Sequence, residues 1–132
     1  MKPYFAALLG VTIFAGASVA SSQAGSSGPS VFTSAQASAG AKTYAAQCSR
    51  CHGAKLEGVS APALTGSGSG LNGDSVSEAY KFISTQMPAG NPGSLSSTEY
   101  LNIVAYILSR NGHAAGTKAL TPAVVKSSSM KF

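Results

Sequence analysis

The chain has 132 residues, enough for one small domain with a modest hydrophobic core. Nine lysine and arginine residues against four aspartate and glutamate residues give a net charge of +5. These basic residues are dispersed and no aromatic-basic patch accompanies them, so the composition gives no indication of nucleic-acid binding.

Residues 1–24 have the pattern of a cleavable export signal. Lys2 provides the positive start, and the apolar stretch at 5–17 is shorter than the ~20 residues that span a bilayer. Small residues then fit the cleavage rule, which predicts processing after residue 20 or 24. We therefore expect an exported, periplasmic protein with no stable membrane span after processing.

A flexible arm is expected at 25–33, because glycine, serine and proline dominate its start. Three capping boxes follow, each a Ser or Thr with Gln or Glu three residues later, at 33–36, 75–78 and 96–99. They predict three helices, which end near residue 47, before Pro88 and at Asn111-Gly112. The last helix has the clearest apolar periodicity, and no stretch alternates as a strand would.

The fold class is therefore predicted as all-α, with an ordered domain at 34–113 and a loosely ordered tail at 114–132. Three short helices separated by a glycine-rich loop at about 53–73 cannot enclose much apolar surface. Something other than side chains must then contribute to the centre of the domain.

The sequence Cys48-Ser-Arg-Cys51-His52 indicates what that is, since Cys-x-x-Cys-His is the attachment signal for c-type haem. Two thiols at this spacing can add to the two vinyl groups along one edge of a porphyrin. The adjacent His52 can then supply an axial nitrogen to the iron. Covalent attachment would keep the haem in a protein too small to enclose it fully.

Three other interpretations compete for the same residues. A disulfide between Cys48 and Cys51 would close a very small loop and stabilise little. A thioredoxin-like redox pair requires a βαβ setting, and no strands are predicted. A zinc site requires four ligands, and only His113 is left to join the two cysteines and His52.

The chain resembles the class I cytochromes c, small bacterial-type monohaem proteins, from about residue 37 to residue 112. In that family a glycine and an aromatic residue lie eight and four positions before the first haem cysteine, where this chain has Gly40 and Tyr44. They form the crossing with the last helix, and Val104–Ile107 fits as the partner segment. The resemblance implies the small cytochrome c fold, with three main helices and long loops around one covalently attached haem c.

The resemblance also implies the remaining site residues. The family places its distal methionine in a loop before the last helix, where Met87 stands, so His52 and Met87 are the expected axial ligands. His113 and Met130 are weaker candidates for the distal position. A proline carbonyl accepts a hydrogen bond from the proximal histidine in the family, and Pro62 is the candidate here.

A His/Met pair closes both axial positions, which favours electron transfer over catalysis. The predicted function is therefore that of a carrier of single electrons rather than an enzyme. Its partners would be redox proteins, by analogy a periplasmic dehydrogenase or a terminal oxidase. Two alternatives stay open: a tightly bound cytochrome subunit of a quinoprotein dehydrogenase or oxidase complex, and a gas-binding or catalytic haem protein with a labile distal ligand.

Overall fold

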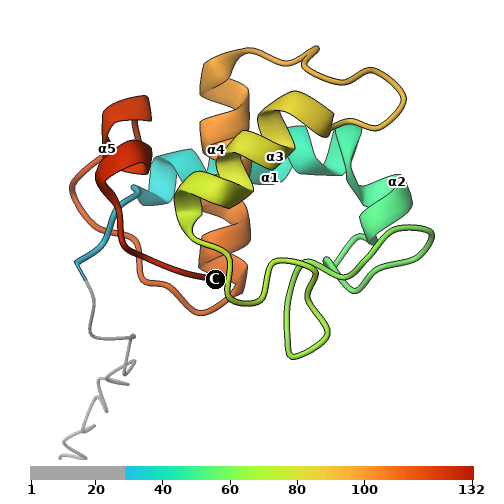
Figure 1. Ribbon diagram of the computed structural model, residues 1–132, viewed down its shortest axis with the longest axis horizontal. Coiled ribbons are helices and arrows are strands. Elements are labelled where there is room, and N and C mark those ends of the chain that lie inside the picture. The colour runs from blue at the N-terminus through green and yellow to red at the C-terminus, as the bar shows by residue number, and fades with distance from the viewer. Residues whose placement is uncertain (1–28) are drawn as a thin grey trace, which may run out of the picture.

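The computed structural model describes residues 29–132, which form five helices and no strands (Figure 1). The helices are α1 (Ser34–Gln47), α2 (Ser49–His52), α3 (Val76–Gln86), α4 (Ser97–Arg110) and α5 (Pro122–Ser127). None of them has the length and apolar character needed to cross a bilayer. The all-α prediction is confirmed, while the predicted export signal and the start of the arm lie outside the described residues.

The three predicted helix starts are those of α1, α3 and α4. In each helix, the N-cap side chain accepts a hydrogen bond from the backbone amide of the third helical residue. The Gln or Glu side chain of that third residue in turn accepts a hydrogen bond from the N-cap backbone amide. Hydrogen bonds from Ser75 and Ser96 hold the pKa values of Glu78 and Glu99 below their usual range. The charged carboxylates thus lie at helix N-termini, where the helix dipole favours them.

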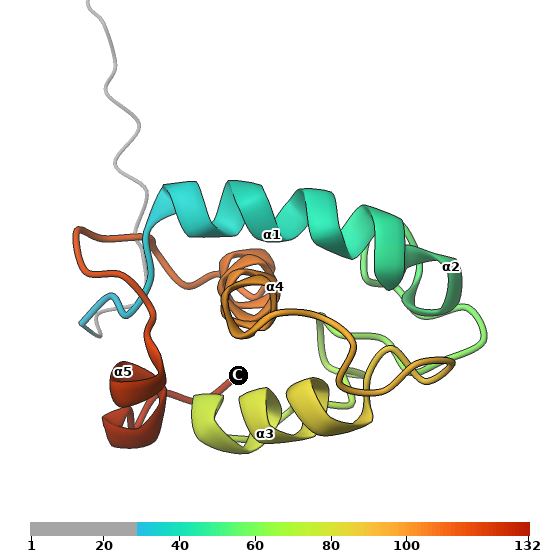
Figure 2. The ribbon, with the colours of Figure 1, turned by 90° about the horizontal axis from the view of Figure 1, so that it is seen from above.

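The core is built around α4, with α1 and α3 on opposite sides of it (Figure 2). The buried residues of α4 are Tyr100, Leu101, Ile103, Val104, Ala105, Ile107 and Leu108. They include the three- and four-residue spacing that the sequence predicted, and they face both neighbouring helices. The central helix is therefore the element against which the other parts of the domain are positioned.

Helices α1 and α4 cross at Gly40. A Cβ atom at that position would lie 1.8 Å from the Asn102 carbonyl oxygen, so only glycine allows the two backbones to approach this closely. One turn later, the Tyr44 ring packs against Tyr106 with 5.3 Å between the ring centroids. The crossing expected from the family resemblance is present.

The segment after α4 differs from the loosely ordered tail that the sequence suggested. Leu120 and Val125 are almost fully buried, and Val125 lies in the short helix α5. The Gln36 side chain both donates to the Leu120 carbonyl and accepts from the Leu120 amide, at 2.8 and 2.7 Å. Farther on, the Val76 amide donates to the Met130 carbonyl.

The same correction applies to the end of the predicted arm, where Phe32 is fully buried in the core. Its carbonyl accepts a hydrogen bond from the Gly116 amide, and this bond joins the end of the arm to the tail. The apolar residues of these segments are too few and too unevenly spaced to give a periodic pattern. Their order comes from contacts with α1 and α3 that the local sequence does not reveal.

Candidate haem site

The Cys-x-x-Cys-His motif forms the bend between α1 and α2. Cys48 ends α1, where its amide donates to the Tyr44 carbonyl at 2.8 Å, and it also begins α2. The amides of Cys51 and His52 then donate to the Cys48 carbonyl at 3.1 and 3.0 Å. A single tight helical turn therefore brings both sulfurs and the imidazole to one end of α1.

Both cysteines are free thiols, Cys48 half-buried and Cys51 exposed. Burial, with a smaller effect of Cys51, raises the pKa of the Cys48 thiol to about 11. A reactive redox cysteine has the opposite property, a lowered pKa that favours the thiolate. Cys48 therefore lacks the lowered pKa that is typical of a catalytic redox cysteine.

His52 is oriented by the loop that follows the motif. Its Nδ1 atom lies 2.8 Å from the Pro62 carbonyl oxygen. A carbonyl can only accept, so Nδ1 carries the hydrogen and Nε2 is the nitrogen that remains available for a ligand bond. The structure thus contains the Pro62 contact that the family resemblance implied.

Two further hydrogen bonds hold the motif and the loop after it, and sequence reasoning missed both. The Tyr44 hydroxyl donates to the Gly53 carbonyl, directly after His52, at 2.7 Å. The Asn111 side-chain amide donates to the Leu64 carbonyl at 2.8 Å, which ties the loop carrying Pro62 to the end of α4. Asn111 had a local explanation as a helix stop, and nothing nearby in the sequence points to a partner 47 residues away.

Replacing Asn111 with alanine is expected to lower the free energy of unfolding by about 1–2 kcal/mol, because the part-buried Leu64 carbonyl loses the donor that this side chain supplies. Denaturant unfolding of the mature protein measures the change. Asn72→Ala is the matched control, since the Asn72 side-chain amide donates to the nearby Gly66 and Ser67 carbonyls in an exposed loop. Equal losses in the two variants would contradict a special role for Asn111.

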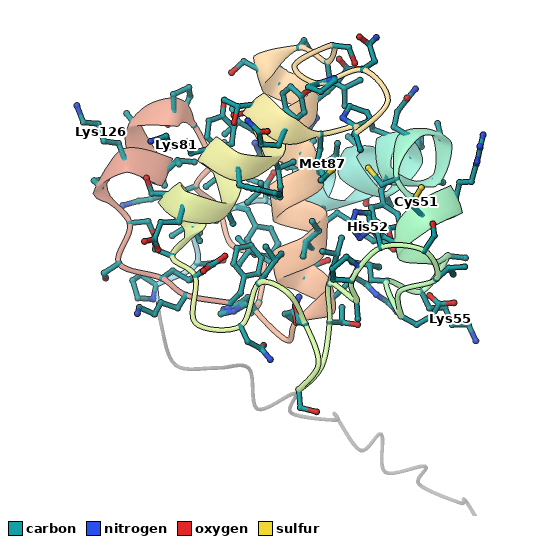
Figure 3. All side chains as sticks on the ribbon, turned by 45° about the vertical axis from the view of Figure 1, so that its right-hand side comes forward. Cys51, His52, Lys55, Lys81, Met87 and Lys126 are labelled. Carbon is teal, nitrogen blue, oxygen red and sulfur yellow. The ribbon has the colours of Figure 1, made fainter. Side chains whose placement is uncertain are left out.

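Met87 lies at the other end of the site, as the residue that ends α3. It is half-buried, and its carbonyl accepts hydrogen bonds from the Gly93 amide at 3.2 Å and from the Tyr100 hydroxyl at 2.7 Å. Figure 3 shows Met87 after α3, and Cys51 and His52 on α2. Segments that are 35 residues apart are thus brought to a common site.

A cavity of about 760 Å³ brings the predicted site residues together. Its lining includes Cys48, Cys51, His52, Pro62 and Met87. Its apolar walls come mainly from the loop before α3, from α3 and from α4. They include Leu64, Leu71, Ile83, Ile103 and Ile107. Thiols, an imidazole and a thioether in an apolar cavity fit a covalently attached haem, for which these groups are the known attachment and axial-ligand types.

The competing ligands do not line this cavity. His113 and Met130 line a different cavity of about 420 Å³, beside Val31 and Val124. Within residues 29–132, no group of three or more His, Cys, Asp and Glu side chains is arranged to hold a metal ion. His113 and Met130 are therefore separate from the cavity that His52 and Met87 line.

Comparison with known proteins identifies a family for this chain. The family described as cytochrome c oxidase, cbb3-type, subunit III, matches residues 35–107, more than half of the chain. Among solved structures, the chain is similar to the sulfane dehydrogenase SoxCD from Paracoccus pantotrophus, with 28% sequence identity and a TM-score of 0.49. That similarity covers 59% of this chain and 44% of the other. No curated protein matches the chain significantly.

Proposed function

Because the chain belongs to the family described as cytochrome c oxidase, cbb3-type, subunit III, we propose that this electron-transfer protein carries one covalently bound haem c and passes single electrons between redox proteins. The observation that carries the proposal is the single cavity that Cys48, Cys51, His52 and Met87 all line. Bound haem would supply a one-electron couple between Fe(III) and Fe(II).

The two cysteines, His52, Pro62 and Met87 each have a distinct role in this proposal. The thiols of Cys48 and Cys51 would form the two thioether bonds, and Nε2 of His52 would be the proximal ligand. The Pro62 carbonyl, 2.8 Å from Nδ1, fixes the imidazole orientation and increases its basicity. The thioether of Met87 would be the distal ligand, which raises the reduction potential relative to a more basic ligand.

The apolar walls of the cavity and the exposed apolar residues at its border are suited to electron exchange at the protein surface. Apolar residues from α3 and α4 would exclude water from the buried part of the group. Among the described residues, Val59 and Phe82 are the large hydrophobic side chains that stay exposed, at 73% and 52%. Phe82 lines the cavity itself, and Val59 directly precedes Ser60, which also lines it. An apolar border of this kind supports a small, short-lived docking contact with a redox partner.

The proposed setting follows from the rest of the chain. The predicted signal at 1–24 supports export to the periplasm. Its removal takes away Lys2 and leaves eight basic and four acidic residues, and this net charge of +4 supports acidic partner surfaces. A periplasmic dehydrogenase or a terminal oxidase is the proposed partner class. The family description, which names an oxidase subunit, favours a second candidate in which the same domain is held permanently in a larger complex. Purification from the native host at high salt separates the two: a free carrier elutes alone, and a subunit elutes with its complex.

The visible spectrum of the mature, reduced protein tests the proposal, recorded before and after carbon monoxide is added. We expect sharp low-spin bands of c type that do not change with the gas, because both axial positions are occupied. Haem should also remain with the polypeptide in a denaturing gel, since it is covalently bound. A shift with carbon monoxide would favour the gas-binding or catalytic alternative, and protein without covalent haem would refute the proposal.

A further inference from the structure

The loop that begins with Met87 has little structure of its own. Residues 89–94 are all exposed, and the segment consists largely of glycine, proline and small polar residues. Within it, the Asn91 amide donates to the Pro88 carbonyl and the Gly93 amide to the Met87 carbonyl. Such a segment has a low cost of local opening, so the position of Met87 depends on where the loop is anchored.

The anchor is the hydroxyl of Tyr100. It donates to the Met87 carbonyl at 2.7 Å and accepts from the Leu95 amide at 3.3 Å. Met87 begins the loop and Leu95 is near its end, so a single oxygen atom joins both ends. Within residues 29–132, Tyr100 is the buried core residue whose side chain is hydrogen-bonded to this loop.

Tyr100 is itself held firmly. It lies in the first turns of α4 and is only 3% exposed, with its ring in the hydrophobic core. The capping box at Ser96 fixes the start of the same helix. The hydroxyl therefore holds the backbone of Met87 at a fixed place relative to the central helix. Because the bond is to the backbone, the methionine side chain can still point into the cavity that it lines.

We propose that Tyr100 is the positioning residue that keeps Met87 in place as the distal ligand. This inference rests on the proposed function, because it concerns the Met87 bond to haem iron. In the holoprotein, replacement of Met87 by an added ligand would break the sulfur–iron bond and form one new ligand–iron bond, with no change in oxidation state. The loop must move away for this to happen, and the Tyr100 hydroxyl opposes that movement through its two hydrogen bonds.

Imidazole binding to the oxidised holoprotein tests the inference in the variant Tyr100→Phe, which removes one oxygen and retains the ring. We expect imidazole to displace Met87 at a concentration roughly three- to tenfold lower than in the native protein. This ratio corresponds to the net strength of one hydrogen bond, since the 2.7 Å bond to Met87 is the stronger of the two that the variant loses. Loss of the sulfur-to-iron charge-transfer band reports the displacement directly. A purely structural role for the hydroxyl would change the unfolding midpoint and leave the imidazole affinity unchanged.

Tyr80→Phe is the matched control. The Tyr80 hydroxyl lies 3.1 Å from the Ser97 hydroxyl and likewise links α3 to the start of α4, but its hydrogen-bond partner lies outside the Met87 loop. We expect this variant to bind imidazole as the native protein does. Equal affinities in Tyr100→Phe and Tyr80→Phe would overturn the inference. A native protein that lacks the charge-transfer band would instead refute Met87 ligation, and with it this part of the proposed function.

Hydrogen exchange of the native holoprotein supplies a second test, which does not depend on a variant that folds. The Leu95 amide should be protected, because its bond to Tyr100 closes the loop. Its exchange should become faster when imidazole has displaced Met87, since both events require the loop to open. An unprotected Leu95 amide in the native protein would contradict the inference.

Discussion

Met87→Ala is expected to give a protein whose reduced haem binds carbon monoxide readily, whereas the native protein ignores the gas. Alanine has no donor atom, and Met87 is the methionine that lines the same cavity as His52 and the two cysteines. The reduction potential should also fall, since methionine ligation favours the ferrous state within the ~0.8 V range that axial ligands control. Carbon monoxide titration and redox titration of the purified holoprotein measure the two effects.

Met130→Ala is the matched control for this experiment. Met130 is also half-buried, but it lines the separate cavity beside His113. We expect its loss to leave the spectrum, the gas response and the potential unchanged, at the cost of some stability from lost packing. If Met130→Ala or His113→Ala opened the iron to carbon monoxide and Met87→Ala did not, the assignment of the distal ligand would be wrong.

The parts of this protein that the sequence predicted are those with a local chemical signature. Capping boxes determine the starts of α1, α3 and α4 because both partners lie within four residues of each other. The haem motif is equally local, since one turn of helix sets the relation between Cys48, Cys51 and His52. For Gly40 and Met87 the family resemblance supplied the missing spatial information, because neither residue identifies its partner by spacing alone.

The parts that the sequence did not predict depend on contacts between distant segments. Tyr100 had a sufficient explanation as one of the apolar residues of α4, and its hydroxyl showed no sign of a partner 13 residues earlier. Asn111 likewise had a complete local explanation as a helix stop. The tail became ordered because Gln36 and Val76 offer hydrogen bonds to Leu120 and Met130, and these are pairs that no periodicity connects. Such positioning contacts follow only from the assembled fold.

The second large effect is expected at the helix crossing, where Gly40→Ala should lower the free energy of unfolding by at least about 2 kcal/mol. A Cβ atom there would lie 1.8 Å from the Asn102 carbonyl oxygen and 2.9 Å from the Tyr106 Cβ atom. Helix propensity favours alanine by about 1 kcal/mol, but overpacking costs about 1–3 kcal/mol and occasionally more, and a contact of 1.8 Å belongs at the upper end of this range. The clash outweighs the propensity because its main partner is the backbone of the central helix, which cannot rotate away. Denaturant unfolding of the holoprotein measures the difference.

The same substitution should also reduce the yield of covalently bound haem, because α1 and α4 supply different parts of one cavity. Cys48 ends α1, while Ile103 and Ile107 of α4 line the wall. Separation of the two helices would therefore move the thiols relative to the apolar surface that receives the macrocycle. Gly68→Ala is the control, since a Cβ atom at Gly68 meets nothing within 4 Å and its stability and haem content should match the native protein. A Gly40→Ala protein as stable as the native one would mean that the helices can separate freely, and the close crossing would then not be what holds the cavity in shape.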